Sequence, residues 1–86
     1  MNIEIIPLAL KKMKLRKIPV EWVKETVESP GQIVSGYMGR RVFQRIYRKK
    51  DEEMLLRVIC DEVDEEKVVI TAYLISQIEK YWREEK

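Results

Sequence analysis

Four alternate positions of one predicted strand carry Arg41, Phe43, Arg45 and Tyr47. Side chains two positions apart in a strand point to the same side of a sheet, so the pattern predicts one cationic and aromatic surface. Guanidinium groups neutralise phosphate and aromatic rings stack on bases, which is what binding of single-stranded nucleic acid needs. Because the chain has no histidine, proton transfer would depend on Arg, Lys, Tyr or carboxylate groups.

Two further candidates, Arg57 and Tyr73, occupy odd positions of later predicted strands. We expect them to share one face with Arg41, Arg45 and Tyr47, opposite an apolar face of even-numbered residues. In RNA cleavage by the 2′-hydroxyl group, Arg45 and Arg57 would hold the phosphate, since guanidinium groups stay charged and grip two oxygens at once. Tyr73 would be the acid-base group.

Each candidate also has a purely structural interpretation. Arg57 would then pair with a nearby carboxylate, that of Asp61 or Glu62, and Tyr73 would pack its ring and bond its hydroxyl locally. The arginines of the preceding strand would simply be solvated, and Tyr47 would be a packing partner within the sheet. The two interpretations differ in whether the arginine side chains are bound to other groups of the protein or are available to a ligand.

Charge is segregated along the chain, although the formal net charge is only +2. Cations gather at residues 11–17 and 40–50, while acidic residues gather elsewhere. Such segregation allows a local positive field that steers anions. Lys11, Lys12 and Arg16 are therefore predicted to contact nucleic acid, with a solvated helix face as the alternative. The Lys- and Glu-rich composition is also typical of heat-adapted proteins.

No metal or cofactor site is predicted. The chain has no histidine and a single cysteine, Cys60, which lies in an apolar run and should be a small buried residue. The carboxylates lack the spacing of a calcium loop, and the three glycines match no nucleotide-binding fingerprint. Since no signal-peptide pattern or membrane-spanning run is found, we expect a cytoplasmic protein.

The periodicity predicts one α+β domain over residues 1–86, because helices and strands are segregated along the chain. It begins with a strand at 2–6 and continues with helices from 7 to about 16 and from 20 to 27. A proline favours the start of each helix, and a proline-glycine pair ends the second. A chain of this length has room for one core.

The rest of the chain is predicted to form a four-strand antiparallel meander with strands at 32–37, 41–48, 54–63 and 68–75. The turns between them are short, and the turn between the second and third of these strands is expected at 49–53. Ser76 and Glu79 have the spacing of a capping box. This box would open a short C-terminal helix that places Tyr81 and Trp82 against the sheet.

Three segments carry a resemblance to known proteins. Residues 8–18 (LALKKMKLRKI) are similar to a stretch that runs His-Ala, two variable residues, Arg-Met, two variable residues and Arg-Gly-Ile. Residues 18–30 match the helix that follows and its proline stop, and residues 68–73 (VVITAY) match a closing strand that ends in Thr-x-Tyr. These patterns resemble the family called domain of unknown function 4258, and the whole layout looks like the RelE-type and BrnT-type toxin nucleases.

The resemblance implies a RelE-like fold and RNA cleavage by Arg, Lys and Tyr side chains without metal. Two positions depart from the family pattern: its histidine falls at Leu8 and its glycine at Lys17. Any role that rests on that imidazole is absent here. Two alternative functions are therefore expected. One is a toxin-like domain that binds or cleaves RNA, free or on the ribosome; the other is a non-catalytic module that binds a second copy of the chain or an antitoxin-like protein.

Overall fold

The computed structural model describes residues 2–83, so residues 1 and 84–86 of the predicted domain lie outside the described part. The order of elements is the predicted one: a strand, two helices, four strands and a short helix. Their bounds are β1 Asn2–Ile5, α1 Pro7–Leu15, α2 Val20–Glu28, β2 Gln32–Ser35, the 3₁₀ turn η1 Tyr37–Gly39, β3 Arg41–Lys49, β4 Glu52–Val63, β5 Glu66–Ile75 and α3 Ile78–Tyr81. The α+β class is confirmed.

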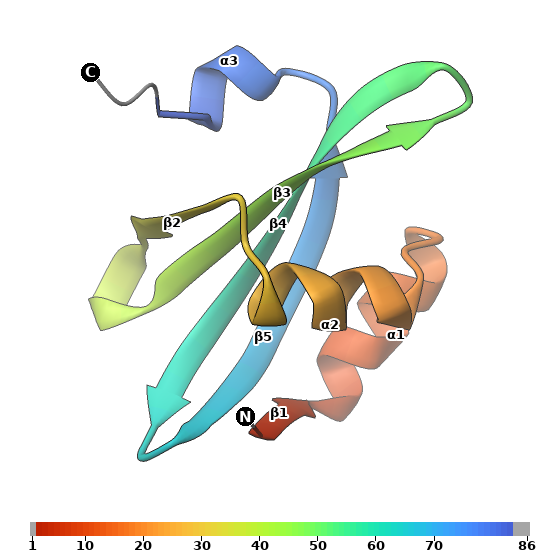
Figure 1. Cartoon of the computed structure of the whole chain (residues 1–86). Coiled ribbons are helices and arrows are strands. Elements are labelled where there is room, and N and C mark those ends of the chain that lie inside the picture. The colour runs from red at the N-terminus through yellow and green to blue at the C-terminus, as the bar shows by residue number, and fades with distance from the viewer. Residues whose placement is uncertain (1, 84–86) are drawn as a thin grey trace.

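All five strands form one mixed sheet in the order β1-β5-β4-β3-β2 (Figure 1). The four strands from β2 to β5 pair antiparallel, which confirms the meander. β1 instead pairs parallel to β5, from Asn2 opposite Glu66 to Ile5 opposite Val69. Parallel strands need a long connection, and here the two helices and three other strands lie between them in the chain.

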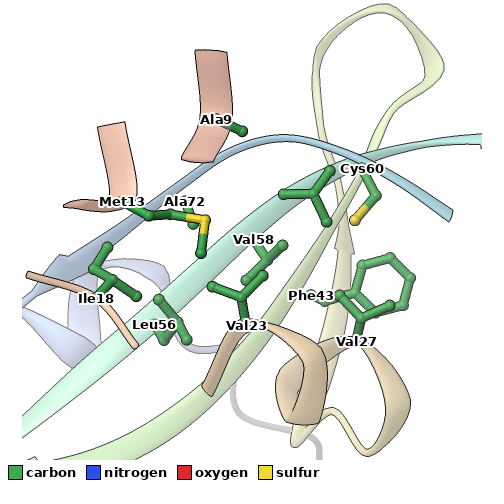
Figure 2. Packing of buried hydrophobic residues seen from close by; sticks show 11 residues of the cluster. Ala9, Met13, Ile18, Val23, Val27, Phe43, Leu56, Val58, Cys60 and Ala72 are labelled. Carbon is green, nitrogen blue, oxygen red and sulfur yellow. The ribbon is translucent and has the colours of Figure 1, made fainter. Parts of the chain in front are cut away.

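One face of the sheet is covered by α1 and α2. Helical spacing brings Ala9 and Met13 of α1, and Val23 and Val27 of α2, onto this face. Figure 2 shows these side chains packed on the sheet residues Phe43, Leu56, Val58, Cys60 and Ala72. No helix among residues 2–83 is long and apolar enough to cross a bilayer.

The end of α1 is a Schellman motif. The amide of Ile18 donates to the carbonyl of Met13 (2.9 Å), and the amide of Lys17 donates to the carbonyl of Lys14 (3.2 Å). Lys17 itself lies in the left-handed region with φ 57°. The position at which the resemblance places a glycine is thus the position where this helix end favours glycine.

The β3–β4 hairpin decides which side chains share a face. Its loop has two residues, Lys50 and Asp51, both with positive φ (50° and 64°), as type I′ turns require. Lys49 therefore pairs with Glu52, and odd residues of β3 lie beside even residues of β4. The prediction of one odd-numbered face across both strands is wrong, because a turn at 49–53 would have paired residues of equal parity.

The next hairpin restores part of that prediction. Val63 pairs with Glu66 across a two-residue turn, which again places odd beside even. A β-bulge between Ile59 and Cys60 then shifts the register by one residue. Beyond the bulge Arg57 lies opposite Tyr73, so these two residues share a face as expected.

Two element ends differ from the predictions. β2 ends at Ser35 because the chain turns there into η1, where Met38 has φ 59°. The capping box is wrong: α3 begins at Ile78, its N-cap is Gln77, and no side chain caps it. α3 lies over the sheet face away from α1 and α2, where its Tyr81 contacts a side chain of β4.

Candidate functional site

A row of four polar side chains crosses the sheet on the face away from α1 and α2. Gln32, Gln44, Arg57 and Tyr73 come from β2, β3, β4 and β5, and the register places each directly opposite the next. A hydrogen bond joins every neighbouring pair: 3.0 Å for the two glutamines, 2.7 Å from Arg57 Nε to Gln44 Oε1, and 2.5 Å from Arg57 Nη1 to Tyr73 Oη. The row is one connected network.

Gln44 is the buried centre of this row, with no exposed surface. Its amide oxygen accepts the bond from Arg57, and its amide nitrogen donates to Gln32 and to the carbonyl of Tyr81 (3.3 Å). These partners fix which way the amide points, since oxygen and nitrogen have different roles. Gln44 therefore holds one edge of the Arg57 guanidinium in place.

Arg57 is half-buried and has no carboxylate partner in the described part of the chain. The carboxylates considered as its partners are used elsewhere: Asp61 pairs with Arg40 (3.0 Å), and Glu62 pairs with Arg41 (2.8 Å) and Lys67. No ion pair to Arg57 occurs within residues 2–83, which overturns the ion-paired interpretation for that part of the chain. Instead, the centroid of the Tyr81 ring lies 4.4 Å from Cζ of Arg57, which is a cation–π contact.

An open groove of about 540 Å³ lies beside this row. Its charged and hydrogen-bonding side chains include Arg40, Arg57 and Tyr73, while Val42 and Ile59 form apolar wall. The remaining lining comes from the end of β2 and from η1, namely Ser35, Gly36 and Tyr37. Cations, a phenol and an apolar wall thus meet in one concave site.

The rim of this groove carries a nearly free aromatic ring. Tyr37 is 92% exposed and Met38 is 88% exposed. The turn that presents them is fixed by the hydrogen bond from the amide of Gly36 to the carbonyl of Arg40 (2.8 Å) and by the positive φ of Met38. A ring held outward in this way is available to stack on a planar ligand.

Arg45 and Tyr47, predicted to belong to the site, lie instead on the face that α1 and α2 cover. Arg45 donates to the carbonyl of Ser29 (2.6 Å) at the end of α2, and its Nε lies 3.7 Å from Glu25 Oε1. The ring of Tyr47 stacks on Trp22 with centroids 4.4 Å apart. These two residues attach α2 to the sheet, so their predicted convergence with Arg57 and Tyr73 is wrong.

Tyr47 also uses its hydroxyl within the fold. It donates to Glu25 Oε1 (2.6 Å) and lies 3.2 Å from the carbonyl of Trp22. Burial raises the pKa of Tyr47 above its usual 10.0, and the hydrogen bond to the Glu25 carboxylate raises it further. Ionisation of this phenol is therefore opposed by the folded state.

The remaining predicted contacts are dispersed. Arg41 is exposed at the start of β3 and paired with Glu62. Lys11 and Lys12 lie on α1, on the other side of the sheet from the groove. Arg16 donates to the carbonyl of Ala72 (2.8 Å) and to Thr71 Oγ1 (3.3 Å), which ties the end of α1 to β5.

Cys60 is buried as predicted, and burial raises the pKa of its thiol to about 12. Such a thiol is unreactive at neutral pH. No group of three or more His, Cys, Asp or Glu side chains within the described residues is arranged to hold a metal ion.

Sequence reasoning missed Gln44, Arg40 and Tyr37, and it placed Tyr81 against the sheet without assigning it to the site. Gln44 had one available signal: it is an amide that directly follows the apolar residues Val42 and Phe43, both of which are buried. A polar residue that is buried must find partners, so such a position marks a network. Tyr37 had no comparable signal, since its exposure depends on the turn that ends β2.

Comparison with known proteins identifies one family. The model described as Domain of unknown function (DUF4258) matches residues 9–74. That span contains the whole row from Gln32 to Tyr73 and the groove beside it, and it excludes β1 and α3. No curated protein and no solved structure matches the chain.

Proposed function

The chain belongs to the DUF4258 family, and we propose that this member is a toxin-like domain that binds single-stranded RNA in the groove beside Arg57. The observation that carries the proposal is the state of Arg57. Its guanidinium is held by the Gln44 amide and the Tyr73 hydroxyl and faces a groove, with no ion pair among residues 2–83 to offset its charge. A positioned cation of this kind suits a phosphate.

Two neighbours of Arg57 fit a nucleotide on either side of that phosphate. Arg40 lines the same groove and is paired with Asp61 through Nε, which leaves the outer guanidinium nitrogens for a second phosphate contact. Tyr37 stands at the rim with its ring in solvent. Base stacking on such a ring is worth about 1–3 kcal/mol per base and tolerates any sequence.

Arg57 and Tyr73 also supply the groups that metal-independent cleavage of RNA needs. The 2′-oxygen of the ribose attacks the phosphorus and forms a 2′,3′-cyclic phosphate, while the bond to the 5′-oxygen breaks. Arg57 stabilises the charge that develops on the phosphate oxygens. Tyr73 donates a proton to the leaving 5′-oxygen, and the 2′-hydroxyl proton passes to water.

Binding of a short labelled oligoribonucleotide, measured by anisotropy across a salt series in EDTA, tests the proposal. We expect affinity to fall with salt, and Arg57→Ala should reduce the log-log slope by about 0.7, the share of one phosphate contact on a single strand. Arg41→Ala is the matched control, because Arg41 is exposed and lies outside the groove lining. Equal slopes for wild type and Arg57→Ala would contradict the proposal.

A second candidate, a protein-interaction module, is favoured by the edge strand β2. β2 pairs with β3 on one side, the sheet ends there among the described residues, and its Ile33 is 44% exposed. An edge strand presents backbone N–H and C=O groups that can pair with a strand of a second copy. Light scattering with size exclusion should then show a dimer that Ile33→Lys dissociates, and a monomer at high concentration would count against self-association.

A further inference from the structure

The outer side of α1 combines exposed leucines with lysines that form no ion pair within the described residues. Leu8, Leu10 and Leu15 are 56%, 41% and 76% exposed, so this helix presents three large apolar side chains to solvent. Residues 7–17 contain no acidic residue. No ion pair within residues 2–83 involves the lysines of this segment, which are Lys11, Lys12, Lys14 and Lys17.

A groove of about 390 Å³ lies between α1 and the start of α2. Its floor includes Met13 and Ile18, the two apolar residues that the Schellman motif brings together. Leu10 and Val20 form apolar walls, and Lys11 and Lys14 stand at its border on the helix. We refer to these six residues as the α1 groove.

We propose that the α1 groove binds an acidic amphipathic segment of a partner protein. An apolar side chain of that segment would pack on Leu10 and Val20, above the buried Met13 and Ile18, and its carboxylates would pair with Lys11 and Lys14. The groove offers only apolar surface and positive charge, so a segment with apolar side chains and carboxylates would match both. Helices recognised in this way present anchors at positions i, i+3 or i+4, and i+7.

Two other occupants fit these observations less well. RNA would neutralise the lysines but leave Leu10, the exposed apolar wall of the groove, in water. A membrane surface would require one continuous apolar face. On a helix of 100° per residue, Leu8 and Leu15 fall on one flank and Leu10 on the other, with Lys11 and Lys14 between them.

This surface is separate from the RNA groove. α1 and α2 cover one face of the sheet, whereas Arg57 and Tyr73 line a groove on the other face. The inference therefore stands or falls independently of the proposed function.

Selection from a displayed library of helical peptides tests the inference. The full chain is the bait, and peptides that also bind Lys11→Glu/Lys14→Glu are removed. We expect the recovered peptides to be enriched in Asp and Glu around apolar residues at helical spacing. Backbone amide shifts of the labelled protein should then change along α1 and at Ile18 and Val20.

Affinity measurements on a recovered peptide complete the test. Lys11→Glu/Lys14→Glu and, separately, Leu10→Asn should each weaken binding by roughly tenfold or more, because one removes the charge match and the other an apolar wall. Arg48→Glu/Lys50→Glu, on the exposed β3–β4 hairpin, is the control for net charge and should change affinity less than threefold. The inference is overturned if the recovered peptides show no acidic enrichment, or if the shifts lie away from α1. It is also overturned if no peptide is recovered and Lys11→Glu/Lys14→Glu instead loses binding to RNA or to anionic vesicles.

Discussion

Arg57 donates a hydrogen bond from Nη1 to the hydroxyl oxygen of Tyr73 at 2.5 Å, across strands β4 and β5. The contact depends on the bulge at Ile59 and Cys60, because the two-residue β4–β5 turn alone would place these side chains on opposite faces. Bulges commonly re-aim a side chain beside a functional site. The arginine and the phenol therefore meet in the RNA groove only because of this register shift.

Tyr73→Phe should separate binding from chemistry. The ring remains and the hydroxyl is lost, so we expect RNA affinity within about threefold of wild type. If Tyr73 is the general acid, cleavage in EDTA should fall by roughly 10²-fold or more. Gel analysis of a labelled oligoribonucleotide measures this loss, with Tyr81→Phe as the control that keeps the ring over Arg57. Undiminished cleavage by Tyr73→Phe would remove the residue from the mechanism.

Gln44→Ala should destabilise the fold. The substitution leaves the Nε of Arg57 and the carbonyl of Tyr81 without their partner, and stranding such groups costs about 1–3 kcal/mol. Urea unfolding followed by circular dichroism measures the change in the free energy of unfolding. Gln77→Ala is the control, since Gln77 is exposed and its side chain makes no cap bond. Equal destabilisation by both variants would show that the network contributes nothing.

Tyr47→Phe should change how stability depends on pH. The pKa of Tyr47 is raised in the folded state above 10.0, so its stabilising contribution is fully present below pH 10 and is lost as the pH rises through the higher folded value. At pH 7 we expect the variant to be less stable by about 1 kcal/mol, because it loses the hydroxyl bond to Glu25. The difference from wild type should shrink above pH 10 in denaturation curves. A constant difference up to pH 11.5 would contradict this account.

Lys17→Gly should stabilise the protein. Lys17 has φ 57° at the end of α1, and a left-handed conformation costs a side-chain-bearing residue about 1–2 kcal/mol. Glycine avoids that cost but has more entropy to lose, so we expect a net gain of roughly 0.5–1 kcal/mol. Lys14→Gly, inside the same helix, should instead lose about 1 kcal/mol. Thermal unfolding of the two variants checks the opposite signs.

The elements could be predicted because each depends on local signals. Prolines at the helix starts, helical spacing of Val23 with Val27, and alternation in the strands all act over a few residues. That Arg57 and Tyr73 share a face was also predicted from odd-even alternation, although in the structure it results from an odd-even turn corrected by a bulge.

The shared face of Arg45 with Arg57 could not be predicted, because turn length sets it. The predicted turn spanned 49–53, whereas the actual turn is Lys50 and Asp51. This difference in turn length places Arg45 on the sheet face that the helices cover. There it meets the carbonyl of Ser29, a partner that exists only after α2 has packed. Polar residues in strands are thus assigned to faces by tertiary structure more than by their own spacing.

The most direct test of the central claim is a nuclear magnetic resonance titration of the labelled protein with a short single-stranded oligoribonucleotide, at low salt and without divalent ions. The claim predicts that the Nε–Hε signal of Arg57 and the amides of 37–39 and 73 shift together with increasing RNA. The amides of α1 should stay unchanged. Shifts confined to α1, or no shift at Arg57 at saturating RNA, would contradict the assignment of this groove to RNA.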